Sequence, residues 1–285
     1  MTAGPAEAWS IDQITGLGVT SVRTGDSTRP RDTGQLVGLD LLGGRDVALA
    51  LTVVSDGTSL QNALKRLAAA LQPGGTTETP FWFQLPGLPQ LCSMVRVRKR
   101  HFPIDLPWSA GLAKVQVLLH STDPRLYAPT QTSTANLPTP LGGMTFPATF
   151  PLSFGGGSAT GDVTIDNTGN VEMRPILVIT GPCTSPKVAN DQAGWSLTFT
   201  NPAQTGFTLS TGESLIVDTG ARTVLLTTGT GMPAPHENWV VPGSTWPSVD
   251  VAGVQPGANT LQFSSSDATT VAGQLSVHWA PAFLL

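Results

Sequence analysis

The stretch TDPRLYAP, Thr122–Pro129, divides the sequence into two parts of different composition. It contains Tyr127, the single tyrosine of the chain. Alternating apolar and polar residues and one helical pattern precede it, whereas a segment rich in proline, glycine and threonine follows it. Asp123-Pro124 favours a turn, because the residue before a proline is kept away from the helical conformation. We therefore place the end of a first domain here.

Two domains of mainly β structure are expected from the composition. The 31 glycines and 24 prolines suit many turns, and 40% hydrophobic residues argue against a disordered chain. Residues 1–129 carry 12 basic and 10 acidic side chains, and residues 130–285 carry 3 and 9, so the net charge changes from +2 to −6. We expect a first domain over 1–129, a linker or edge segment over 130–160 and a second domain over 161–285. Neither domain is basic enough to bind nucleic acid by charge alone.

The first domain shows a hairpin pattern and a helical pattern. Leu36–Leu42 and Val47–Val54 flank the turn sequence Gly43–Asp46, which predicts a β-hairpin. A helix is expected to start at Thr58, because Thr58 and Gln61 can form a capping box. Leucines and alanines then recur at helical spacing until a Pro-Gly-Gly sequence ends the pattern. The pattern is one-sided, so this helix should pack on a sheet.

A basic strand is expected at Leu91–Phe102. Its arginines Arg96, Arg98 and Arg100 alternate with valines, so a regular strand would place all three on one face. That face is either a basic stripe, suited to phosphate or to acidic partner subunits, or an ordinary solvated sheet face. Both interpretations stay open at this point.

The second domain shows about eight short strand patterns separated by turn residues. This spacing is typical of an antiparallel β-sandwich or jelly roll. Trp195 and Trp279 alternate with other apolar residues, so we expect both in the core. Trp239 and Trp246 lie in loop-like sequence, where an indole either stacks on a sugar ring or packs onto the sandwich.

No catalytic or cofactor motif stands out. Asp-Thr-Gly occurs twice, at Asp32–Gly34 and Asp218–Gly220, but only the second has the apolar lead-in that an aspartic protease needs. We therefore expect Asp218–Gly220 to be a hairpin turn. The four histidines show no metal-ligand spacing, and Cys92 and Cys183 lack partners, so both thiols are expected to be buried. No cofactor, metal or enzymatic activity is predicted. The lack of a signal pattern or a long apolar run predicts a soluble protein made in a cytoplasm.

Taken together, these motifs resemble the distal tail protein family of siphophages, especially those of actinobacteria. In the first domain the resemblance lies in GGRDVALALTVVSD, NALKRLAAAL, FWFQLPG, VRVRKR and STDPRLYAP. In the second domain it lies in NTGNVEMRPILVITGP, SLIVDTGARTVLL and PGANTLQF. It covers nearly the whole chain, and its motifs are turn-and-strand signatures.

The resemblance implies a structural virion protein. Its first domain would be a β-sandwich with one helix, related to tail-tube proteins, and would form a hexameric ring with a channel for DNA. The ring would join the tail tube to the baseplate hub or tail tip, close to the tape measure protein, after assembly in the host cytoplasm. Its second domain would be galectin-like and would dock other tail proteins or bind a host saccharide. Arg96, Arg98 and Arg100 would then form intersubunit ion pairs or line the channel.

Two hypotheses therefore compete. One is the ring-forming tail protein, and the other is a carbohydrate-binding module that stacks sugars on Trp239 and Trp246. In either case Asp123, Pro124, Arg125 and Tyr127 are expected to anchor the chain where it leaves the first domain. Arg125 would seek a carboxylate and Tyr127 would pack its ring, although a contact with a neighbouring subunit is the alternative for these residues.

Overall fold

The structure is a computed structural model. It describes residues 7–18, 21–55, 57–104, 106–138, 161–200, 207–228, 234–235, 254–266 and 272–285. The chain divides into two compact units, and each has its own core. Unit 1 comprises Met1–Leu126 with Leu284–Leu285, and unit 2 comprises Tyr127–Phe283. The chain therefore passes between the units twice, and the first passage lies inside the TDPRLYAP stretch.

Unit 1 is built on one long sheet. Within unit 1 its strand order is β1-β6-β9-β8, with β7 paired to β8 outside this path. The strands of unit 1 are β1 (Glu7–Thr15), β6 (Arg45–Ser55), β7 (Thr79–Gln84), β8 (Gln90–His101) and β9 (Leu112–Ser121). The two-residue strands β10 (Leu126–Tyr127) and β23 (Ala282–Phe283) lie where the chain passes between the units. The long central pairs β1–β6, β6–β9 and β8–β9 are all antiparallel. Strand β8 pairs with β7 through its first half and with β9 through its second half.

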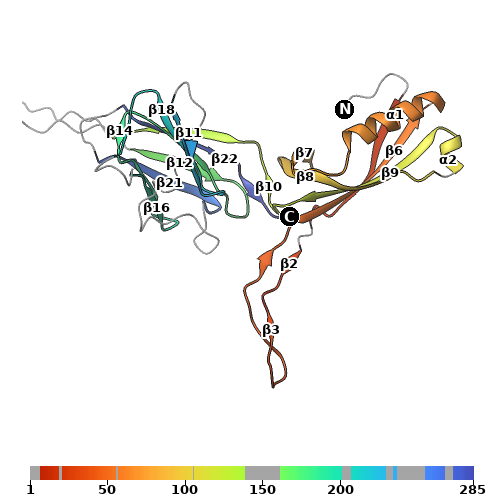
Figure 1. Cartoon of the computed structure of the whole chain (residues 1–285), viewed down its shortest axis with the longest axis horizontal. Coiled ribbons are helices and arrows are strands. Elements are labelled where there is room, and N and C mark those ends of the chain that lie inside the picture. The colour runs from red at the N-terminus through yellow and green to blue at the C-terminus, as the bar shows by residue number, and fades with distance from the viewer. Residues whose placement is uncertain are drawn as a thin grey trace, which may run out of the picture. The chain divides into compact units, whose positions relative to one another are not determined.

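One face of this sheet is covered by the helix α1 (Gly57–Ala70) (Figure 1). Leu60, Ala63, Leu64 and Leu67 point from the helix into the core, each at most 6% exposed. They meet the buried alternate residues of β6 and β9, which include Val47, Val53, Val115 and Val117. The predicted helix and its packing on a sheet are thus confirmed. A second, four-residue helix, α2 (Leu106–Ser109), follows β8.

Residues 21–44 form an extended arm rather than half of the predicted hairpin (Figure 1). Strand β2 (Val22–Arg23) pairs with β5 (Leu41–Leu42), and β3 (Ser27–Thr28) pairs with β4 (Gln35–Leu36). The predicted pairing of Leu36–Leu42 with Val47–Val54 is therefore wrong. Strand β6 takes β1 and β9 as neighbours instead, because alternation in a strand determines which face is buried but not which partner it pairs with.

The arm is held by few interactions. Besides its two short ladders, the Gly38 N–H donates to Asp26 Oδ1 at 2.8 Å. A Cβ atom at position 38 would collide with the carbonyl group of Gly25. The backbones of the two sides of the arm are therefore in direct contact at Gly25 and Gly38. At the base, the Gly43 N–H donates to the Ser21 carbonyl at 2.6 Å.

Unit 2 is an antiparallel β-sandwich. One sheet has the order β11-β22-β13-β18-β19-β20 and the other β12-β21-β15-β16, and their inner faces share one core. The strands are β11 (Gln131–Asn136), β12 (Asp162–Asn167), β13 (Ile176–Thr180), β15 (Lys187–Asn190), β16 (Trp195–Thr198), β18 (Glu213–Asp218), β19 (Thr223–Thr228), β20 (Ala234–Pro235), β21 (Gly257–Ser264) and β22 (Gln274–Trp279). A further pair is formed by β14 (Cys183–Thr184) and β17 (Thr208–Leu209). The mainly β, antiparallel prediction is confirmed.

Part of the expected segment 130–160 belongs to this sandwich. Strand β11 is the edge strand of the six-stranded sheet and pairs with β22 along its whole length. Residues 139–160 lie outside the described part of the chain. None of the described helices is long and apolar enough to span a membrane.

Two separate cores predict two separable unfolding transitions. Leu67→Ala removes a fully buried side chain from unit 1 and should lower the stability of that unit by about 2–5 kcal/mol. Leu177→Ala should do the same to unit 2. Differential scanning calorimetry measures both, and each substitution should shift a different transition. Equal shifts of all transitions by either variant would contradict this division.

Candidate assembly surfaces

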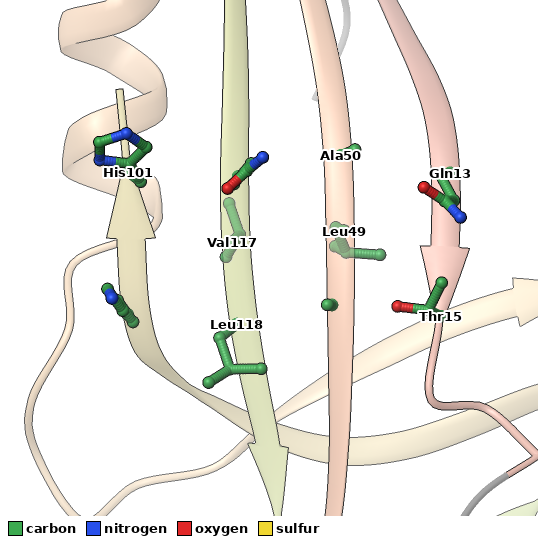
Figure 2. A pocket seen from close by; sticks show the side chains of 10 residues that line it. Gln13, Thr15, Leu49, Ala50, His101, Val117 and Leu118 are labelled. Atoms are coloured by element: carbon green, nitrogen blue, oxygen red, sulfur yellow. The ribbon is translucent and has the colours of Figure 1, made fainter. Parts of the chain in front are cut away.

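The face of the unit 1 sheet that points away from α1 is open and polar. We call it the open sheet face. It contains a shallow hollow of about 460 Å³ that crosses β1, β6, β9 and β8 (Figure 2). Its lining includes Gln13, Thr15, Ala48, Ala50, Lys99, His101, Gln116 and Leu118. Small and neutral polar side chains dominate it, and its lysine and histidine lie on β8.

This face comes from strand register. Gln13 lies opposite Ala50, and Ala50 lies opposite Gln116, which in turn lies opposite His101. Residues that face each other across antiparallel strands share a sheet face. The lining residues with a hydroxyl, amine or imidazole group are Thr15 of β1 and Lys99 and His101 of β8.

The three arginines of β8 do not share a face. A β-bulge between Val97 and Lys99 inserts Arg98 as an extra residue and reverses the alternation beyond it. Arg96 lies opposite His120 on the open sheet face, whereas Arg100 lies opposite Val117 on the core side. The prediction of a single Arg96–Arg98–Arg100 face is therefore wrong. The sequence pattern does not reveal this bulge, because Arg, Val and Lys near the end of a strand can lie on either the core face or the solvent face of a sheet.

Arg100 has a local structural task. Its Nη1 donates to the carbonyl of Ala68 and, at 3.2 Å, to that of Leu71, where α1 ends. A cation at this position satisfies carbonyl groups that have no partner inside the helix and interacts favourably with the helix dipole. Its guanidinium also lies 5.7 Å from the centre of the Phe102 ring. Lys99 and His101 take the places on the open sheet face that alternation assigned to Arg98 and Arg100.

The end of unit 1 is organised by a buried arginine that the sequence pattern did not single out. Arg45, at the start of β6, is 0% exposed. Its Nε and Nη2 both donate to the carbonyl of Pro124, at 3.0 and 2.7 Å. Burial lowers the pKa of the Arg45 guanidinium from its ordinary value, and the Asp123 carboxylate opposes this by favouring the charged form.

The residues around Pro124 complete this arrangement. The Ser121 hydroxyl donates to the Asp123 carbonyl at 2.7 Å. Asp123 Oδ1 accepts the backbone N–H of Arg125 at 3.0 Å and lies 3.5 Å from Arg125 Nη1. Arg125 therefore has the carboxylate that its sequence context suggested, supplied by Asp123. We call Arg45, Ser121 and Asp123–Arg125 the exit clasp.

Beyond the clasp the chain belongs to unit 2. Tyr127 is half-buried and packs against the unit 2 core, and the Ala128 N–H donates to the Pro281 carbonyl at 2.9 Å. The described contacts of the four predicted junction residues thus differ: those of Asp123, Pro124 and Arg125 lie inside unit 1, whereas Tyr127 packs against the unit 2 core.

Unit 2 has a polar hollow of about 470 Å³ on its four-stranded sheet, which we call the unit 2 hollow. Asp162, Lys187, Asp191 and Gln262 provide most of its polar groups, and the backbone of Gly161 lies at its edge. Trp195 and Trp279 are in the core as predicted, at 2% and 6% exposure. Trp239 and Trp246 lie outside the described residues, so their stacking role stays a prediction.

The other motifs are structural. Asp218 Oδ1 accepts the backbone N–H groups of Gly220 and Ala221, both at 2.8 Å, in the turn between β18 and β19, which confirms the predicted turn. Asp32 accepts the backbone N–H of Thr33 near the end of the arm. Cys92 and Cys183 are buried as predicted, and burial raises the pKa of Cys183 to about 12. No group of His, Cys, Asp and Glu among the described residues could hold a metal ion.

The fold has counterparts among solved structures. The Dit (gp 19.1) protein of phage SPP1, described as a paradigm of the hub adsorption apparatus in phages that infect Gram-positive bacteria, matches with a TM-score of 0.63 and 14% identity. The match covers 97% of this chain and 94% of that one. The baseplate of phage P2 in its activated conformation with Ca matches with a TM-score of 0.48 and 8% identity, over 95% of this chain and 90% of that one. No protein-family model and no curated protein matches the sequence. At this identity the SPP1 likeness shows a shared fold.

The exit clasp can be tested by substitution. Arg45→Ala leaves the Pro124 carbonyl without its two donors, so the free energy of unfolding of unit 1 should fall by about 2–4 kcal/mol. Arg23→Ala, at an exposed position on the arm, is the matched control and should change it by less than about 0.5 kcal/mol. Denaturant titration measures both values. A loss for Arg45→Ala no greater than that of the control would show that the clasp is dispensable.

Proposed function

We propose that this chain is a structural protein of a phage tail. More specifically, it would be a distal tail protein that forms a hexameric ring between the tail tube and the baseplate hub or tail tip. The observation that carries the proposal is the likeness of fold to SPP1 Dit over nearly the whole of both chains. A second line of support is the resemblance of the sequence motifs to those of distal tail proteins.

The exposed features of unit 1 support self-association. The arm carries apolar side chains into solvent, among them Leu36 at 51%, Val37 at 95% and Leu39 at 66% exposure. The sheet ends at β1, whose outer edge has no partner strand among the described residues. A monomeric protein normally covers its free sheet edges and its apolar groups. In a ring, neighbouring copies would cover them.

The open sheet face is the proposed wall of the DNA channel. Its centre is lined by small and neutral polar groups, such as Ala48, Ala50 and Gln116, which do not hold phosphates tightly. DNA would then pass without sequence-specific binding. Lys99 and the nearby Arg96 would supply the positive charge of this wall, while Arg100 contacts the end of α1. In this arrangement the chain needs no catalytic group and no cofactor.

The remaining partners follow from a position at the tail tip. The ring would contact the tail tube protein on one side, the baseplate hub or tail tip proteins on the other, and the tape measure protein near the channel. The chain would be located in the virion after assembly in the host cytoplasm. Unit 2, which has its own core, would dock other tail proteins or bind a host saccharide.

The oligomeric state is the first test. Mass photometry of the purified 29.6 kDa chain should show a species of about 180 kDa, and electron microscopy should show rings with a central channel. A folded species that remains at the monomer mass at all accessible concentrations would contradict the proposal.

Carbohydrate binding by unit 2 is a second candidate function, favoured by the unit 2 hollow. Carboxylate, amide and ammonium groups such as those of Asp162, Gln262 and Lys187 are the usual partners of sugar hydroxyls. Trp239 and Trp246 would add stacking if they reach the same sugar. This function is compatible with the ring, because it belongs to the other unit.

A glycan array of host cell-wall saccharides tests this candidate. Asp162→Ala should weaken binding about tenfold, since a hydrogen bond to a charged group is worth about 1.5 kcal/mol or more. Trp239→Ala and Trp246→Ala should each weaken it further if they stack. Thr164→Ala, exposed on the same strand but outside the hollow, is the control. A wild-type chain that binds none of the saccharides would leave only the structural role for unit 2.

A further inference from the structure

The arm presents an apolar patch that its own chain leaves uncovered. Val37 and Leu39 are 95% and 66% exposed, and they lie two residues apart, so in extended backbone they point to the same side. Burying each side chain would contribute about 1.5–3 kcal/mol. A two-stranded ribbon of this size is only marginally stable in water without further packing. The arm therefore gains order and free energy from a surface that accepts these two side chains.

Unit 1 also carries an apolar groove of about 320 Å³, formed where α1 faces the segment that follows β8. We call it the helix groove. Its floor is apolar, with Leu64, Ala68, Phe102 and Trp108, and its rim carries Gln61 and Lys65. Phe102 and Trp108 are only partly buried, and Gln61 and Lys65 are exposed. The groove thus offers aromatic and aliphatic surface to an incoming side chain, with one cation beside it.

We propose that Val37 and Leu39 of one copy occupy the helix groove of a neighbouring copy of this chain. The inference rests on the proposed ring and names the contact that would hold it together. Asp40 follows Leu39 directly and is exposed, and Lys65 stands on the rim of the groove, so the two surfaces are complementary in charge as well as in polarity. Among the described residues that line the groove, none is acidic.

The open sheet face does not fit the same side chains. Its lining includes Gln13, Lys99, His101 and Gln116, whose polar groups would lose water without gaining hydrogen bonds from valine or leucine. The helix groove exposes mainly carbon atoms and avoids this cost. The arm therefore selects the groove and leaves the open sheet face free.

We take the arm of a second copy as the occupant of the helix groove. The arm and the groove are different surfaces of the same chain, so one copy can use both at once. Each copy gives its arm to one neighbour and its groove to another, which is a head-to-tail contact. Such a contact gives a closed ring when the rotation between copies closes, and an open filament when it does not. No further partner is needed to cover the arm.

A disulfide cross-link tests the contact directly. Val37→Cys combined with Ala68→Cys should give covalent oligomers on mild oxidation, seen as a ladder on a non-reducing gel. Val37→Cys combined with Ala69→Cys is the matched control, since Ala69 is the next residue of α1, exposed and outside the groove lining. The native Cys92 and Cys183 are buried and burial raises the pKa of both thiols, so they should not compete.

Charge reversal provides a second readout without cysteines. Asp40→Lys and Lys65→Asp should each raise the concentration needed for half-assembly by about 2- to 5-fold, as expected for a rim ion pair, and the double variant should restore it. Mass photometry over a dilution series measures the three values. Circular dichroism checks that each variant is folded.

The outcomes separate this contact from the proposed function. Rings of about 180 kDa that give no Val37→Cys/Ala68→Cys cross-link, or an equal one with Ala69→Cys, overturn the arm contact and leave the ring intact. A chain that is monomeric at every concentration overturns the ring and the contact together. Cross-linking confined to the Ala68→Cys pair, with rescue by the double charge reversal, establishes the contact.

Discussion

A buried cation governs the construction of unit 1. Arg45 lies in a dry interior, where an ionised group is stable only if its donors are satisfied and a countercharge is near. The Pro124 carbonyl accepts from Nε and Nη2, and the Asp123 carboxylate provides the countercharge, whereas the buried Nη1 has no hydrogen-bond partner among the described residues. Both partners come from the segment that follows β9. The start of β6, the end of β9 and the exit of the chain are therefore fixed by one set of contacts.

Much of this fold follows from patterns visible in the sequence, and the exceptions have physical causes. The helix α1 and the buried face of β6 are predictable, because period and burial are properties of a single segment. The partners of a strand are not predictable in this way. The sequence of Leu36–Leu42 and β6 is typical of a hairpin, yet β6 pairs with β1 on one side and with β9 on the other. Pairing depends on competing segments far away in the sequence.

The candidate surfaces show the same limit at the scale of single residues. Alternation puts Arg96, Arg98 and Arg100 together, but one inserted residue in β8 sends Arg100 to the helix and brings Lys99 to the open sheet face. Arg45 sits in a Gly-Gly-Arg-Asp sequence that resembles a solvent-exposed turn, and only the tertiary structure reveals its burial. The residues that line the hollows on both units come from several strands, so no local sequence motif predicts either hollow. The role of a residue that depends on neighbours from other strands therefore cannot be predicted from a single sequence.

The two passages of the chain between the units bear on the order of synthesis. Every residue of the unit 1 core, from Leu17 to Leu119, is translated before unit 2 begins at Tyr127. The first sheet and its helix can thus fold on the ribosome while the sandwich is still being made, as domains generally do during translation. The arm emerges even earlier, ahead of the groove and of the whole second unit. On a polysome, where many copies are made side by side, the exposed Val37 and Leu39 of the arm would be accessible to neighbouring nascent chains for most of the synthesis time.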